Sequence, residues 1–134
     1  MPELIAEFAR TVATSDTARL RTLVMTRQEF AWLYYPTSRY TRAPTIQEPA
    51  LAWFLHLQQS QKGATRLLNR FGGRPLRLLT NRCNDSASVE AENRLWTDCM
   101  QQVISGGDTV RMRLIGGIYE RGGTFKILTY ANDL

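Results

Sequence analysis

Three glycine doublets divide the last third of the chain into short segments, and this pattern constrains the fold more than any other feature of the sequence. The doublets lie at 106–107, 116–117 and 122–123. Between them, apolar residues tend to occupy every second position, as in a strand with one buried face. These alternating residues are Val110, Met112, Leu114, Phe125 and Ile127. The carboxy-terminal third therefore reads as strands joined by tight turns.

The pattern predicts four strands, at 74–83, 94–104, 109–120 and 124–131, with a polar loop at 84–93. Gly122-Gly123 suits a two-residue hairpin turn, because such turns need positive φ at both central residues. The resulting register sets Arg121 opposite Thr124, Ile118 opposite Ile127 and Leu114 opposite Ala131. The apolar pairs then share one face of the sheet. Gly116-Gly117, inside a strand, predicts a bulge or a close approach of other atoms.

The first half of the chain has helical spacing instead. It predicts helices at 3–14 and 17–24, and a third short helix that begins at the capping box Thr26–Glu29 and ends before Pro36. A polar loop at 36–47 and a second capping box, Thr45–Glu48, precede a long helix over 48–71. We expect Gly72-Gly73 to end this helix, as a glycine in the left-handed conformation would, and Gly63 is a place where the helix could kink or break.

Helices followed by an antiparallel sheet indicate an α+β fold, with the helices packed on a curved, cone-like carboxy-terminal sheet of about four strands. At 134 residues the chain fits one domain over 1–134 and is long enough to bury a core. Curved sheets make pockets, so we expect a pocket on the sheet, although the pattern names no ligand.

This order of elements resembles the nuclear-transport-factor-2-like, or cystatin-like, superfamily, in which a bent sheet wraps helices around a pocket. The segments 29–36, 93–99 and 130–134 are similar to small uncharacterised bacterial proteins, some of them exported. Enzymes of the superfamily include ketosteroid isomerase, polyketide cyclases and limonene epoxide hydrolase. No local motif of this chain matches the isomerase residues, so the resemblance implies a fold and a pocket but no catalytic residues.

Two cysteines, Cys83 and Cys99, lie eight positions on either side of Ala91 in the polar connection. A symmetric hairpin would set them opposite each other, within reach of a cross-strand disulfide. The alternative is a pair of small buried thiols. A disulfide would indicate an exported protein, periplasmic or extracellular, and free thiols a cytoplasmic one. The spacing is not that of a zinc site, and we expect no metal and no cofactor.

The net charge of +5 comes from 15 arginines and 2 lysines against 12 acids. Six of the cations fall between Glu48 and Asp85, a stretch without acidic residues: Lys62, Arg66, Arg70, Arg74, Arg77 and Arg82. This stretch is either an anion-binding face or a solvated helix and sheet rim. The sequence does not favour nucleic-acid binding, because aromatic residues are sparse in the cationic stretch and no recognised nucleic-acid-binding module is readable.

Two titratable residues are candidates for catalysis. His56, the only histidine, could act as a general base, although a lone helical histidine is more often hydrogen-bonded and without a role. Asp98 alternates with Trp96 and Met100, and if it faces a pocket its pKa would be raised. The alternatives are that the strand register is different, or that Arg94 or Arg113 pairs with it across the strands. Tyr34 or Tyr130 would complete either site.

Aromatic residues and one arginine are the candidates for ligand binding: Trp32, Tyr40, Trp53, Trp96 and Arg113. Aromatic side chains dominate pockets and cores alike, and a core position is the expectation for Trp32 and Tyr34. The ligand would be small and either apolar or anionic. The sheet face that carries Arg111 and Arg113 could instead meet a second copy of the chain, giving a homodimer through the sheet.

No apolar run approaches the length of a membrane span, and the opening Met1-Pro2-Glu3 lacks the features of a signal peptide. No Ser-His-Asp set, phosphate loop or carboxylate pair at useful spacing is present. The sequence therefore favours a noncatalytic ligand-binding or protein-interaction module. The alternative is a small-molecule isomerase or hydrolase that uses Asp98 or His56 with a pocket tyrosine.

Overall fold

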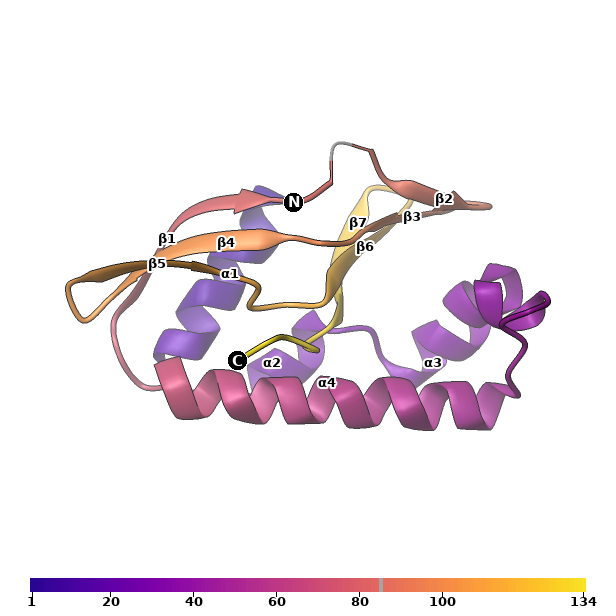
Figure 1. Ribbon diagram of the computed structural model, residues 1–134, viewed down its shortest axis with the longest axis horizontal. Coiled ribbons are helices and arrows are strands. Elements are labelled where there is room, and N and C mark those ends of the chain that lie inside the picture. Colours follow the sequence, from indigo (N-terminus) through magenta and orange to yellow (C-terminus); the bar gives the residue numbers. More distant parts are fainter. Residues whose placement is uncertain (85) are drawn as a thin grey trace.

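A computed structural model describes residues 1–84 and 86–134, so Asp85 of the expected loop lies outside the described residues. The fold is α+β, with helices packed on antiparallel strands (Figure 1). The helical elements are α1 Pro2–Ala13, α2 Thr17–Leu23, α3 Arg27–Glu29, η1 Phe30–Tyr34, η2 Tyr35–Thr37, η3 Arg39–Thr41 and α4 Pro49–Phe71. The strands are β1 Leu76–Arg82, β2 Ser88–Glu90, β3 Asn93–Trp96, β4 Met100–Ser105, β5 Asp108–Met112, β6 Gly117–Arg121 and β7 Thr124–Thr129.

The helix ends follow local chemistry. The side chain of Asp16 accepts from the Arg19 amide at the start of α2, and Thr26 and Glu29 form the predicted capping box of α3. The predicted second capping box is wrong: α4 begins after Glu48 without a side-chain cap, with Pro49 in its first turn. At its other end the predicted glycine doublet is confirmed: Gly72 is the C-cap and Gly73 has positive φ (70°). The third predicted helix continues as a π-helical turn, η1, and the expected loop at 36–47 contains η2 and η3.

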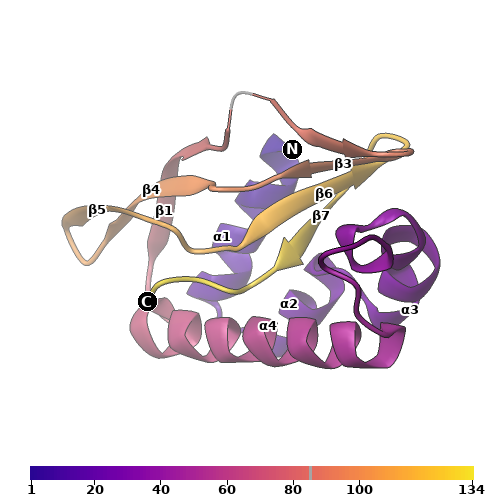
Figure 2. The same ribbon diagram turned by 45° about the vertical axis from the view of Figure 1, so that its right-hand side comes forward.

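The strands form two sheets, ordered β1-β4-β5 and β2-β3-β6-β7, and every pairing is antiparallel. Figure 2 shows the two sheets following each other as one bent ribbon, because β3 runs into β4 and β5 into β6. Two predicted long strands are thus each divided at the bend, at 97–99 and at 113–116. Asp98 has positive φ (51°) there, which a regular strand does not accommodate.

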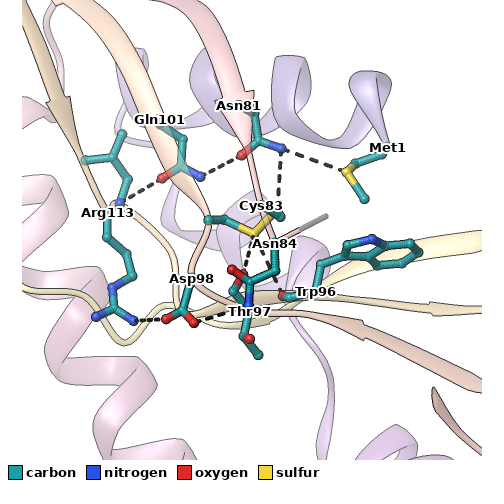
Figure 3. Close-up of a disulfide and its surroundings, with 11 residues drawn as sticks. Met1, Asn81, Cys83, Asn84, Trp96, Thr97, Asp98, Gln101 and Arg113 are labelled. Atoms are coloured by element: carbon teal, nitrogen blue, oxygen red, sulfur yellow. Dashed lines mark hydrogen bonds and ion pairs between the residues drawn. A yellow bond between two sulfur atoms is a disulfide. The ribbon is translucent and has the colours of Figure 1, made fainter. Parts of the chain in front are cut away.

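A buried glutamine replaces ladder hydrogen bonds at this bend. The Gln101 side chain is fully buried; its Oε1 accepts from the Leu114 amide at 2.8 Å and its Nε2 donates to Asn81 Oδ1 at 2.7 Å. Figure 3 shows Gln101 between Asn81 and the chain near Arg113. Since an unsatisfied buried amide is costly, this side chain holds together the place where both strands are interrupted.

Two hydrophobic clusters make up the core. The larger lies between α1, α2, α4 and the strands, and includes Phe8, Leu67, Val103, Ile118 and Ile127. The smaller joins the α3–η1 segment to the β3-β6-β7 strands and the amino-terminal half of α4. Its buried members are Met25, Phe30, Tyr34, Ala52, Leu95, Tyr119 and Leu128. The long helix α4 contributes to both clusters and runs along the molecule (Figure 1).

Candidate functional site

An open groove of about 580 Å³ lies between α2, the segment that follows it, and α4. Its lining residues are Thr17, Leu20, Arg21, Val24, Met25, Thr26, Arg27, Trp53, Leu57, Ser60, Gln61, Ala64, Thr65, Leu68 and Tyr130. Figures 1 and 2 both place α2 beside the middle of α4. The curved sheet does not line this groove. The lining comes from α2, α3, α4 and the extended residues 24–26, and only Tyr130, just after β7, comes from the sheet end of the chain.

Helical spacing creates the two walls. On α4, Trp53, Leu57, Ser60, Ala64 and Leu68 follow one another at intervals of three or four residues and share one face. On the opposite wall Leu20 and Val24 repeat four residues apart. The groove therefore has an apolar floor that two amphipathic segments build together.

The polar groups of the floor are already hydrogen-bonded within the protein. Tyr130 Oη donates to the Leu20 carbonyl at 2.6 Å, and the Tyr130 amide donates to Ser60 Oγ at 3.0 Å. Burial raises the pKa of the Tyr130 hydroxyl well above its usual value, so it stays protonated. Ser60 and Tyr130 thus fasten the end of β7 to both helices and leave an apolar surface above them.

The charge of the groove is one-sided. Arg21 and Arg27 stand on the wall that α2 and α3 provide, both are exposed, and neither forms an ion pair with any residue of the described ranges. The lining contains no Asp, Glu, His or Cys. The groove thus combines apolar surface with positive charge, and Tyr130 is its one titratable lining residue besides the two arginines.

His56 lies outside this groove and packs against the aromatic rings of the smaller core cluster. Its Nε2 donates to the Leu128 carbonyl at 2.9 Å, and its ring lies 5.3 Å from that of Phe30 and 6.5 Å from that of Tyr34. Burial lowers the pKa of His56, and the hydrogen bond to the carbonyl partly offsets this. The residue is a hydrogen-bonded core histidine, neutral at pH 7, that connects α4 to β7.

This burial predicts a pH dependence of stability. Because the folded-state pKa lies below the unfolded value of about 6.5, the stabilisation is complete above about pH 6.5. It falls as the pH drops from about 6.5 to the folded pKa, since only the unfolded chain binds the proton in that window. A difference of one in pKa is worth about 1.4 kcal/mol. Urea unfolding between pH 5 and pH 8 measures this loss.

His56→Gln is the matched variant for that measurement. It removes the chain's only imidazole, so its stability is expected to change less than that of the wild type between pH 6.5 and pH 5.5. Burial raises the pKa of Glu90, which acts in the opposite direction in both proteins. Wild-type and His56→Gln stabilities that change in parallel through this window contradict the assignment, because the contribution of Glu90 is common to both proteins.

Asp98 and Arg113 lie together at the bend, on the surface (Figure 3). The Asp98 carboxylate is 3.6 Å from the Arg113 guanidinium and accepts from Asn84 Nδ2 at 3.3 Å, and its side chain is 66% exposed. Arg113 also binds Asp133 at 3.1 Å. Asp98 does not face a pocket, because the strand that would have pointed it inward is interrupted at 97–99. The arginine pairing considered from the sequence is the arrangement found.

Cys83 and Cys99 form a disulfide with an S–S distance of 2.04 Å. The ladder sets Arg82 opposite Met100, so the bridge continues the register of β1 and β4 by one step, as the symmetry about Ala91 predicts. Cys99 is fully buried. The bridge ties the end of β1 to the interruption between β3 and β4.

The aromatic candidates are distributed over the molecule. Trp53 lines the groove, and Tyr34 is buried in the smaller core cluster. Trp32 is 79% exposed, so its expected core position is wrong: Phe30 and Tyr34 occupy the buried side of η1. Tyr40 packs at the edge of the smaller cluster, under the Arg39 guanidinium. The ring of Trp96 lies 5.8 Å from that of Phe125 on the strands, and the two rings are tilted relative to each other.

Sequence reasoning missed most of the groove. Arg21, Arg27, Leu57 and Ser60 were not among the candidates, although helical spacing could have placed Leu57 and Ser60 on one face of α4 with Trp53. No sequence signal shows that this face meets α2. That pairing depends on tertiary packing, and it is what brings the two arginines to the groove.

Searches against protein-family models, curated proteins and solved structures found no match. The described residues contain no cluster of three or more His, Cys, Asp or Glu side chains suited to holding a metal ion. Among the same residues, no helix is both long and apolar enough to cross a membrane.

Proposed function

We propose that this chain is a noncatalytic binding domain that holds a small ligand in the groove between α2 and α4. The single observation that carries the proposal is the composition of the groove: an apolar floor, two exposed arginines, and no carboxylate, imidazole or thiol among its lining residues. Its volume of about 580 Å³ falls in the range of ordinary small-molecule sites.

The alternative, an isomerase or hydrolase, has less support. Asp98 is solvated and paired with Arg113, whereas His56 and Tyr34 lie in a packed aromatic cluster. Tyr130, which does line the groove, donates its hydroxyl proton to the Leu20 carbonyl. Paired or solvated polar groups are what a binding module requires, because its ligand needs shape and charge but no proton transfer.

The proposed domain works outside the cytoplasm, as the disulfide supports. Its order of elements supports the resemblance to nuclear-transport-factor-2-like proteins, but the proposed site lies between helices instead of inside a cone.

A homodimer through the sheet has weaker support, since the large exposed apolar residues of the described strands are only Leu79 and Val89. Nucleic acid is not proposed as a partner; Arg66, for example, already binds Asn132.

A neutral fluorescent probe, N-phenyl-1-naphthylamine, tests the groove without involving charge. Ala64→Phe should fill the groove and lower the affinity for the probe at least tenfold, because the added ring occupies the space between the walls. Tenfold corresponds to about 1.4 kcal/mol. The measurement is a fluorescence titration of oxidised protein.

Gln59→Phe is the matched control, since Gln59 lies on the same helix, is exposed and does not line the groove. It should leave the probe affinity within about twofold of the wild type. Circular dichroism and the unfolding midpoint establish that each variant is folded. A folded Ala64→Phe protein that binds the probe as tightly as the wild type would overturn the proposed site.

A further inference from the structure

We infer that the ligand of this groove is an anionic amphiphile, a single aliphatic chain with a carboxylate head held by Arg21 and Arg27. The inference rests on the proposed function and adds the chemical class of the ligand. It begins with the charge of the lining, which holds two cations and no anion. Neither guanidinium forms an ion pair with a described residue, so both are available to a ligand.

The floor of the groove indicates the chemistry of the rest of the ligand. Leu20, Val24, Leu57, Ala64 and Leu68 present aliphatic surface along the groove. Burying an aliphatic chain on such a surface is favourable by about 0.8 kcal/mol for each methylene, or about fourfold in affinity. A sugar or another polar ring would instead lose its hydrogen bonds to water on binding. The floor could not replace them, because Ser60 and Tyr130 already form hydrogen bonds within the protein.

The arginines lie at one side of this surface and not across it. Arg21 belongs to α2 and Arg27 to α3, whereas the α4 wall contributes only neutral side chains. A ligand with one charged end and one apolar end matches this separation. Arginine suits the head group, since its planar guanidinium can donate two parallel hydrogen bonds to a carboxylate.

The shape of the site favours a free amphiphile over a membrane surface. The apolar residues and both arginines line a concavity between helices, into which a flat bilayer cannot enter. The exposed apolar side chains Leu51, Phe54 and Leu55 of α4 are not part of this lining. A membrane-binding face would require apolar and cationic residues together on a convex surface.

Competition against N-phenyl-1-naphthylamine at pH 7.5 tests the inference with three ligands that share one chain: dodecanoate, dodecanol and dodecylammonium. Dodecanoate should displace the probe at a concentration at least tenfold lower than dodecanol, and dodecylammonium should be the weakest. Decanoate should bind roughly 15-fold more weakly than dodecanoate, because it has two fewer methylenes.

Arg21→Gln and Arg27→Gln, singly and together, should weaken dodecanoate and leave dodecanol within about twofold. Arg94→Gln, an exposed arginine of β3 outside the groove, is the control and should change neither. Equal displacement by dodecanoate and dodecanol, or arginine variants that bind dodecanoate like the wild type, would overturn the inference while leaving the binding site intact.

Two other outcomes have separate meanings. If Ala64→Phe leaves the affinity for the neutral probe unchanged, the groove is not the binding site. The proposed function is then wrong, whatever the result with dodecanoate. If the protein binds phosphatidylglycerol vesicles through Arg21 and Arg27 and dodecanoate does not displace the probe, the partner is a lipid surface and the inference is wrong. The expected result is displacement by dodecanoate with no binding to such vesicles.

Discussion

Gly63→Ala should destabilise the folded protein by about 3 kcal/mol or more. A β-carbon at Gly63 would lie 1.8 Å from the Tyr130 carbonyl oxygen and 3.0 Å from the Ala131 Cα. Both are backbone atoms, so no side-chain rotation relieves the overlap. The carboxy-terminal segment is also held in place here, because Ser60 Oγ accepts from the Tyr130 amide and Asn132 Nδ2 donates to the Gly63 carbonyl at 2.9 Å.

The expected loss of stability on Gly63→Ala is informative, because intrinsic helix propensity alone predicts that this substitution stabilises the protein. Alanine is more favourable than glycine in a helix interior by about 1 kcal/mol. Urea unfolding of Gly63→Ala, with Gln59→Ala on the exposed side of the same helix as a control, measures which effect dominates. The control should change stability by less than about 0.5 kcal/mol. A Gly63→Ala protein as stable as the wild type would show that the segment does not pack against α4 as the structure has it.

Gly63 also shows a case in which the local sequence pattern is not sufficient to predict the structure. A glycine in a polar stretch of a long helix predicts a kink or break, yet α4 is continuous over Pro49–Phe71. Only glycine fits at position 63, because the backbone of Tyr130 and Ala131, just after β7, crosses α4 at this point. That crossing joins residues about seventy positions apart, and no local spacing encodes it.

Local chemistry was predictable where a few neighbouring residues decide the outcome. The Gly122-Gly123 turn sets Arg121 opposite Thr124 and Ile118 opposite Ile127, as predicted. The register then shifts between Gly117 and Ile118, so the predicted Leu114–Ala131 pair is not part of the ladder. Beyond that shift a buried side chain, Gln101, takes over the hydrogen bonding of the Leu114 amide.

The candidate site was less accessible to sequence reasoning than the fold. Trp53 is a candidate for ligand binding from the sequence, and it lines the groove; its role toward a ligand stays a prediction. Arg21 and Arg27 lie in helices that were correctly expected, but their relevance depends on how α2 packs beside α4. Asp98 was considered as a pocket acid on the assumption of an unbroken strand, and its positive φ interrupts that strand.

Removing the disulfide is the second change with a large expected effect. Cys83 and Cys99 are 16 residues apart, and opening a loop of that size releases unfolded-chain entropy worth about 3 kcal/mol. For a chain of this length the double variant Cys83→Ala/Cys99→Ala should therefore unfold about 10 °C lower. The native contacts that remain at this place are modest: the β1–β4 ladder reaches Arg82, and beyond the bridge the Asn84 amide donates to the Thr97 carbonyl at 3.4 Å.

Reductant separates the effect of the bridge from that of the two side chains. Dithiothreitol should lower the urea midpoint of the wild type to near that of the double variant, and should leave the double variant unchanged. The two proteins are not expected to coincide fully, because Cys99 is completely buried and its replacement by alanine leaves a small cavity. Mass measurement and thiol titration establish that the bridge is fully reduced. If the urea midpoint of the reduced wild type is then unchanged, the bridge adds nothing to stability.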